Sequence, residues 1–165
     1  PYRERKHVPR EEHWRTLNVY RPRFPILPKL SGRYNVPLMA RAILPLVRRL
    51  HREDPFDVID ASFFYPDGPV AARLARELGI PFSIKARGAD IHMWGRDPAT
   101  RPQVMKAADE ASGLLAVSEA MKRSMIGMGM DGDKITVHYT GVDLERFKIG
   151  SSIEAKKAFS LSGPV

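Results

Sequence analysis

The sequence contains no cysteine, which excludes a disulfide scaffold and a cysteine-ligated metal site. A reducing compartment such as the cytoplasm fits this composition. No apolar run approaches the ~18 residues that a membrane-spanning helix needs, and no secretory signal sequence is recognisable. With 165 residues and 43% hydrophobic content, the chain is long enough for one domain with a real core.

Several motifs of known chemistry are also missing. There is no phosphate-binding P-loop, no G-x-S-x-G nucleophile elbow and no H-E-x-x-H metal motif, so we expect no metal and no bound cofactor. The segment Gly127 to Gly132 matches G-x-G-x-x-G, but it follows a predicted helix and precedes a predicted strand. A dinucleotide fingerprint follows a strand and opens a helix. We therefore interpret this segment as a helix end and a turn.

The positive charge is concentrated in the first third of the chain. The net charge is +8, and residues 1–52 carry 13 Lys and Arg against 3 Asp and Glu, whereas residues 53–165 carry 14 against 16. An acidic lipid, a nucleic acid or a phosphorylated substrate could each match this charge. Because no nucleic-acid recognition element is visible, we expect no nucleic-acid partner.

The N-terminal third begins with a charged, aperiodic stretch, residues 1–13, which predicts a loop. Residues 16–20 are a candidate strand. Residues 36–52 have a helical period, with Met39, Ile43 and Leu50 on one face and arginines on the others. Two interpretations of this basic helix remain open. It packs on the core with a solvated basic side, or it lies on an anionic membrane surface.

The centre of the chain predicts a strand–helix–strand unit. A short apolar run spans residues 57–61, and apolar residues then recur at helical spacing over residues 70–78. Gly79 is a good helix stop, and a second strand is predicted over residues 82–86. Strands joined by such a helix are parallel.

The same alternation continues to the end of the chain. Helices are predicted over residues 101–111, 119–128 and 153–159, and strands over residues 113–117 and 134–139. The fold class is therefore α/β, with a mostly parallel sheet and flanking helices.

Polar turns follow the predicted strands at their carboxyl ends. They are residues 65–68, 87–90, 118–119 and 140–143. Ligands of open parallel sheets bind outside these ends, so we expect a crevice for a phosphorylated or polyhydroxylated ligand. Asp67 and Gly68 are equally well explained as helix-cap and turn residues, and Gly88 can also be interpreted as a turn glycine. For Arg87 we favour a functional role, because a cation that ends a buried strand needs an anionic partner.

The motifs in this order resemble the group 1 family (family 4 type) of retaining glycosyltransferases with the GT-B fold. The resemblance covers residues 56–148 and rests on D-V-I-D-A with Y-P-D-G, R-G-A-D-I, A-D, V-S, and G-V-D followed by Phe147. It implies two Rossmann-like domains, of which the first shapes the acceptor site and the second binds the nucleotide-sugar. We accordingly expect residues 1–150 to be part of the acceptor-side domain and residues 151–165 to begin the junction with a donor-binding domain. The chain would then be a piece of a longer protein.

The resemblance also assigns roles to residues of the polar turns. The catalytic residues would be Arg87 and Asp90; the substrate-binding residues would be Tyr65, Asp67, Gly68, Gly88 and Ser118; the hinge residues would be Gly141 and Asp143. Two positions depart from the family pattern. Arg87 stands where many members have a histidine, and it cannot act as an acid or base near neutral pH. Thr140 stands where an asparagine is usual.

These expectations lead to one function and two alternatives. The longer protein would transfer a sugar, of hexosyl type, from a nucleotide-sugar to a glycan or lipid-linked acceptor with retention of configuration, as in polysaccharide biosynthesis. This chain alone would be inactive. It would be cytoplasmic or peripheral on the inner face of the membrane. The alternatives are a non-catalytic basic module that binds polyanions or an anionic membrane surface, and a different nucleotide-using α/β enzyme.

Overall fold

Four parallel strands form the central sheet of the computed structural model, which describes residues 8–25 and 31–163, with residues 31–33 as backbone only. The strand order is β3–β4–β5–β6. The bounds are β3 (Ile59–Ala61), β4 (Phe82–Ala86), β5 (Gly113–Ala116) and β6 (Ile135–Val137). Each strand pairs in parallel with the next one along the chain, which confirms the predicted α/β class.

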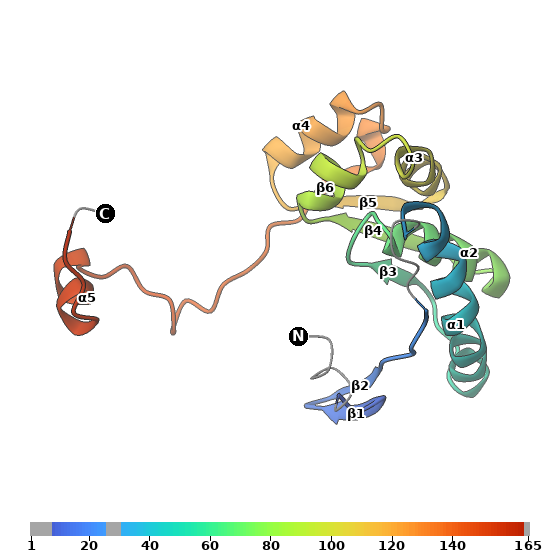
Figure 1. The fold of residues 1–165 in the computed structure, drawn as a ribbon, viewed down its shortest axis with the longest axis horizontal. Coiled ribbons are helices and arrows are strands. Elements are labelled where there is room, and N and C mark those ends of the chain that lie inside the picture. The colour runs from blue at the N-terminus through green and yellow to red at the C-terminus, as the bar shows by residue number, and fades with distance from the viewer. Residues whose placement is uncertain (1–7, 26–30, 164–165) are drawn as a thin grey trace.

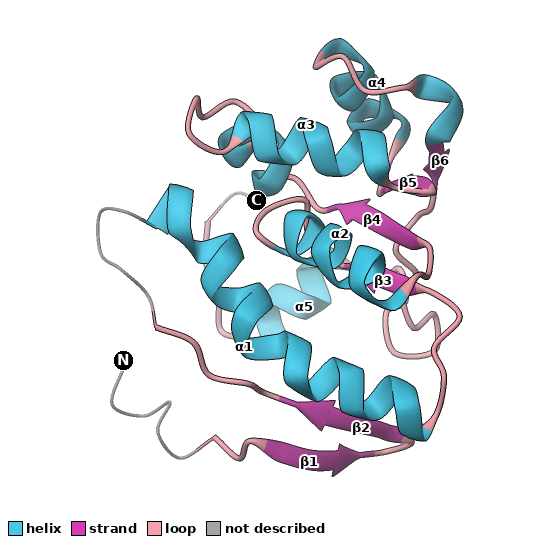
Figure 2. Ribbon diagram, turned by 90° about the vertical axis from the view of Figure 1, so that its right-hand side faces the viewer, coloured by secondary structure: helices cyan, strands magenta, loops and turns pink. Residues whose placement is uncertain are grey.

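A helix joins each strand to the next. These helices are α2 (Asp67–Leu78), α3 (Arg101–Glu110) and α4 (Glu119–Gly127). Figure 2 shows α2 and α3 in front of the strands, and α1 (Ser31–Glu53) packs alongside α2. As predicted, α2 stops at Gly79, which takes the left-handed conformation (φ 70°) and donates its N–H to the carbonyl of Ala75.

The core lies between the sheet and this helical layer. Ile84 and Leu114 are paired on the face of the sheet that the helices cover. They belong to the same core as the buried side chains of Val104 and Met125. An added Cβ on Gly68 would stand 3.0 Å from Cδ1 of Ile84, so the absence of a side chain lets α2 approach the sheet. Alternation places Asp60, Ser83, Lys85 and Thr136 on the opposite face, which we call the polar face of the sheet.

An antiparallel hairpin precedes the main sheet. It consists of β1 (Glu11–Trp14) and β2 (Leu17–Tyr20) joined by a two-residue turn, in which Arg15 has φ 56°. The prediction of a loop over residues 1–13 was therefore wrong for residues 11–13, which belong to β1; residues 1–7 lie outside the described part. Pairing with β2 provides hydrogen-bond partners for the backbone of this charged strand. Because β1 lacks an alternating apolar pattern, its sequence does not indicate a strand.

Two further elements depart from expectation in smaller ways. A π-helical turn, η2 (Asp90–Trp94), fills the stretch after β4, where no element was predicted. Near the end of the chain, α5 (Ser152–Ala158) follows an extended, exposed segment and stands apart from the sheet in Figure 1. The predicted boundary between residues 150 and 151 remains a prediction, and its outer limits at residues 1 and 165 lie outside the described residues. Within the described chain, no helix has the length and apolar character needed to cross a membrane.

Candidate functional site

The carboxylate of Asp90 organises the carboxyl-end edge of the sheet. The side chain is fully buried, with an exposed fraction of 0%. Its Oδ2 accepts the N–H of Phe64 at 2.9 Å, and its Oδ1 accepts the N–H groups of Gly88 at 2.7 Å and Arg87 at 3.0 Å. One carboxylate therefore ties the loop after β3 to the loop after β4.

These hydrogen bonds explain why the buried charge of Asp90 is tolerated. A carboxylate without partners would be costly to bury, but backbone N–H groups that point at its oxygens compensate the lost hydration. Both oxygens of Asp90 are engaged in this way. The geometry thus gives Asp90 a positioning role, and its predicted part in catalysis stays a prediction.

Two of the predicted substrate-binding residues lie against this centre. Tyr65 is buried, with 3% exposed, and its ring packs on that of Trp94 with centroids 5.4 Å apart. Burial, followed by the nearby charge of Asp97, raises the pKa of the Tyr65 hydroxyl. Asp67 opens α2, and burial together with the charge of Asp90 raises the pKa of its carboxyl group. Asp67 does not cap the helix, because the preceding Pro66 occupies the cap position without a side-chain bond.

Arg87 differs from Asp90 in the environment of its side chain. Its side chain is exposed, and among residues 8–25 and 31–163 its guanidinium group has no ion pair or hydrogen bond. The adjacent Gly88 has φ 130°, a conformation that favours glycine. A Cβ at Gly88 would lie 4.0 Å from the methyl group of Met121 on α4, so the loop after β4 also approaches the β5–α4 connection.

The remaining predicted residues have local roles. Ser118 is the N-cap of α4, as its sequence position indicated, and its Oγ accepts the N–H of Met121 at 3.1 Å. Gly141 and Asp143 lie in the exposed segment after β6. Asp143 accepts the N–H groups of Glu145 and Arg146, both at 3.0 Å. Within the described residues, the side chain of Asp143 bonds only to its own turn and not to the Asp90 cluster, and the hinge assignment of Gly141 and Asp143 remains a prediction.

Sequence reasoning missed several residues that build this edge. Phe64 and Trp94 are unremarkable in the sequence, yet one donates to Asp90 and the other stacks on Tyr65. A signal was present in the spacing from Arg87 to Asp90, because aspartate readily accepts hydrogen bonds from backbone N–H groups two or three residues away. Nothing local indicated the bond to Phe64.

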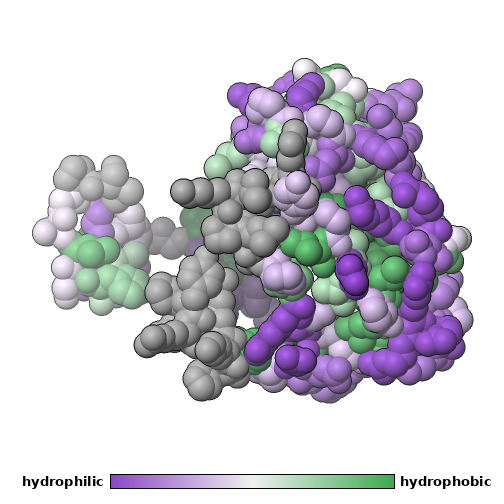
Figure 3. Space-filling model, turned by 45° about the vertical axis from the view of Figure 1, so that its right-hand side comes forward, coloured by the Kyte–Doolittle hydropathy of each residue, from purple (hydrophilic) through white to green (hydrophobic). Residues whose placement is uncertain are grey.

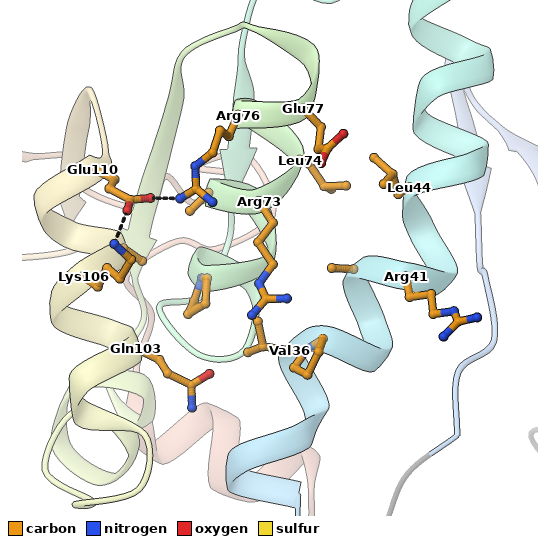
Figure 4. A pocket seen from close by; sticks show the side chains of 15 residues that line it. Val36, Arg41, Leu44, Arg73, Leu74, Arg76, Glu77, Gln103, Lys106 and Glu110 are labelled. Carbon is orange, nitrogen blue, oxygen red and sulfur yellow. Dashed lines mark hydrogen bonds and ion pairs between the residues drawn. The ribbon is translucent and has the colours of Figure 1, made fainter.

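A groove of about 490 Å³ lies elsewhere, between α1, α2 and α3 (Figure 4). Apolar side chains such as Val36 and Leu44 line it together with charged ones. Glu110 pairs with Arg76 and Lys106 at its border, each at 2.7 Å. None of the predicted site residues lines this groove, so it is separate from the carboxyl-end edge.

Comparison with known protein families decides the membership of this chain. The family model described as Glycosyltransferase Family 4 matches residues 2–146. The chain belongs to Glycosyltransferase Family 4. No curated protein matches the sequence.

Solved structures agree with this family in fold. The structure of Anabaena HepE in complex with UDP has a TM-score of 0.57 at 21% identity, covering 83% of this chain and 35% of HepE. The complex of HepE with UDP-glucose has a TM-score of 0.58 at 18% identity, covering 72% of this chain and 32% of HepE. This family 4 chain therefore has the Rossmann-like fold of GT-B domains and spans about a third of HepE.

Proposed function

We propose that this chain is the acceptor-side part of a longer glycosyltransferase that transfers a hexosyl group from a nucleotide-sugar to a glycan or lipid-linked acceptor. Family membership supports sugar transfer in general. HepE, which shares the fold, was crystallised with UDP and with UDP-glucose, and this makes a UDP-sugar the first donor to test.

The observation that carries the proposal is the exposed guanidinium group of Arg87, directly after β4. Arg87 stands at the carboxyl end of a buried strand, where ligands of parallel sheets bind, and it has no anionic partner among the described residues. Its backbone N–H is fixed by Asp90 at 3.0 Å. A guanidinium group on such a fixed backbone suits a phosphate of the donor or a developing charge on the leaving diphosphate.

We further propose that transfer proceeds with retention and without a metal ion. An arginine supplies charge stabilisation but no proton transfer near neutral pH, so its role would be electrostatic. In the described residues no three His, Asp or Glu side chains are grouped to hold a metal; metal independence remains a proposal that chelation can test. Activity should then survive EDTA.

A transfer assay tests this function in the longer protein that we propose contains the chain. UDP release from UDP-glucose would be followed with candidate glycan and lipid-linked acceptors, and the anomeric configuration of the product would be read by NMR. Arg87→Met should reduce kcat at least about a hundredfold, the effect of removing one donor that stabilises charge in a transition state. The matched control Arg73→Met removes an exposed arginine of α2 and should leave kcat unchanged. The 165-residue chain by itself should show no transfer.

The same assay separates this function from the basic binding module. That alternative predicts strongly salt-dependent binding of this chain to heparin or anionic vesicles and no response to any nucleotide-sugar. On the basic helix α1, Arg48 pairs with Glu77 and Arg49 pairs with Glu53. Figure 3 shows, on the side it displays, hydrophobic areas interrupted by hydrophilic residues. Neither feature favours a membrane-binding face, so we propose a cytoplasmic location for the transferase and treat peripheral membrane association as the secondary possibility.

A further inference from the structure

The polar face of the sheet carries a lysine that is largely buried and has no ion pair among the described residues. Lys85 on β4 exposes only 8% of its surface, although Thr136 on the same face is exposed. Among residues 8–25 and 31–163, its Nζ forms no ion pair, and its one contact is Nδ1 of His138 at 2.7 Å. Asp60, the carboxylate on this face, instead accepts a bond from the hydroxyl of Ser83 at 2.5 Å. An anionic ligand would compensate the hydration that this lysine has lost.

The contact between Lys85 and His138 leaves donors on both sides. An ammonium group has hydrogens and no acceptor, so Nζ donates and the lone pair of Nδ1 accepts. The imidazole then carries its hydrogen on Nε2, which is a second donor, and the ammonium group keeps two further hydrogens. Because both groups only donate, a ligand for this pair needs several acceptor oxygens and a negative charge, and it needs no hydrogen-bond donor. A phosphate or diphosphate ester meets these conditions.

The backbone holds the two side chains on either side of β5. Lys85 lies opposite Leu115 of β5, so its side chain crosses one strand to reach His138. His138 follows β6 directly, and its N–H donates to the carbonyl of Ala116 at 2.8 Å. Arg87 follows Lys85 by two residues and is exposed without a partner in the described chain. Lys85 and His138 are thus in direct contact, and Arg87 follows at the carboxyl end of the strand that carries Lys85.

We propose that Lys85 and His138, extended by Arg87, form a binding site for a phosphate or diphosphate ester on the polar face of the sheet. The choice of this ligand class rests on the proposed function, in which the donor carries a diphosphate and an acceptor can carry a phosphate. Arg87 belongs to the family motif R-G-A-D-I, whereas Lys85, inside β4, and His138, before the G-V-D segment, lie outside the family motifs.

The test is a titration of the full 165-residue chain with inorganic pyrophosphate at constant ionic strength. The Cε1–H signals of the five histidines are followed by NMR, and the signal that His138→Gln removes is assigned to His138. We expect a saturable shift of that signal. Lys85→Met should weaken binding about tenfold, the effect of losing one charge-assisted hydrogen bond of ~1.4 kcal/mol. Arg73→Met, which removes an exposed arginine on α2, is the matched control and should change the affinity less than about twofold.

Thermal unfolding of the same variants separates ligand binding from a purely structural role. Methionine keeps the apolar stem and removes an unmatched charge, so Lys85→Met should not lower the Tm of the free chain. Pyrophosphate should raise the Tm of the wild type and not that of Lys85→Met. His138→Gln changes an exposed side chain and gives a second variant with weakened binding if Lys85→Met does not fold.

Three results would overturn the proposal: no saturable shift of the His138 signal, an equal loss of affinity in Arg73→Met, or a lowered Tm of free Lys85→Met. Tighter binding of UDP than of pyrophosphate would identify the donor as the source of the phosphate. Equal binding of glycerol phosphate and UDP would identify a phosphorylated acceptor. The titration with pyrophosphate does not measure sugar transfer, so the two proposals are tested separately. If the transfer assay fails but pyrophosphate still binds, the proposed function is refuted and the proposed binding site is not.

Discussion

Replacement of Asp90 is the most informative perturbation of the carboxyl-end edge. In Asp90→Ala, the N–H groups of Phe64, Arg87 and Gly88 lose their shared acceptor. The N–H of Phe64 is buried, whereas those of Arg87 and Gly88 are partly buried and can turn to water. Each hydrogen bond to a charged group contributes ~1.5–3 kcal/mol, and a buried unsatisfied donor costs ~1–3 kcal/mol. Allowing for relaxation of two of the three donors, we expect a loss of ~3–5 kcal/mol in the free energy of unfolding.

Urea denaturation followed by circular dichroism measures this loss. The midpoint should fall while the m-value stays constant, because the surface exposed on unfolding is unchanged. Asp90→Asn keeps the shape and one acceptor oxygen, so its loss should be smaller, ~1–3 kcal/mol. Asp131→Ala is the control, because that carboxylate accepts a single exposed bond from the N–H of Asp133 at 2.9 Å. The control should cost ~1 kcal/mol or less.

The structural argument fails if Asp90→Ala and Asp131→Ala have similar effects. A loss below ~1.5 kcal/mol in Asp90→Ala would mean that the loops find other partners, and the carboxylate would then not be what holds the two strand ends together. Asp90 would in that case be available for a direct role toward a substrate. A large loss in Asp90→Ala with a small loss in Asp90→Asn would show that the acceptor geometry matters more than the charge.

Three further predictions concern neighbouring residues. An added Cβ in Gly95→Ala would stand 2.6 Å from the carbonyl oxygen of Ile91, so the backbone must shift and urea denaturation should show a loss of ~1–3 kcal/mol. Ser118→Ala removes the N-cap bond of α4 and should cost ~1 kcal/mol in the same assay; no loss would mean that another group caps the helix. Burial and Asp90 raise the pKa of Asp67 above its ordinary 3.8, so the folded state binds this proton more tightly than the unfolded state. The contribution of this proton to the free energy of unfolding is complete below pH 3.8 and is lost as the pH rises through the raised pKa. Urea midpoints measured across that pH range should show this loss in the wild type and not in Asp67→Asn.

The strands and helices that bury a continuous apolar surface were predictable from the sequence. Residues 82–86 were predicted as a strand and form β4 with the same bounds, and Gly79 ends α2 as expected. In both places local residues determine the structure, through an apolar run and a left-handed glycine. The strand β1 was missed because its stability comes from pairing with β2 and from no apolar face of its own.

The candidate site was predictable in position and less so in its contacts. The rule that polar turns meet at the carboxyl ends of parallel strands brought Tyr65, Asp67 and Arg87 to one edge. The bond from Phe64 to Asp90 joins residues 26 positions apart, and the contact of Lys85 with His138 joins residues 53 apart. Such pairings depend on strand order and register, which local patterns do not specify. The run F-S-I-K-A predicted a buried strand, and only the fold shows that its lysine is largely buried with no carboxylate partner among the described residues.

The two residues predicted to be catalytic differ in their surroundings. Asp90 is fully buried and both of its oxygens accept backbone N–H groups. The side chain of Arg87 is exposed and has no hydrogen bond or ion pair among the described residues. The position of the Arg87 backbone is therefore set by Asp90 and does not depend on any contact of the guanidinium group. The resemblance to the family implies a histidine at this position, and the carboxylate that holds the turn bonds to the main chain and does not discriminate between side chains. We propose that the arginine supplies a permanent charge on this turn, which suits phosphate binding more than acid–base chemistry.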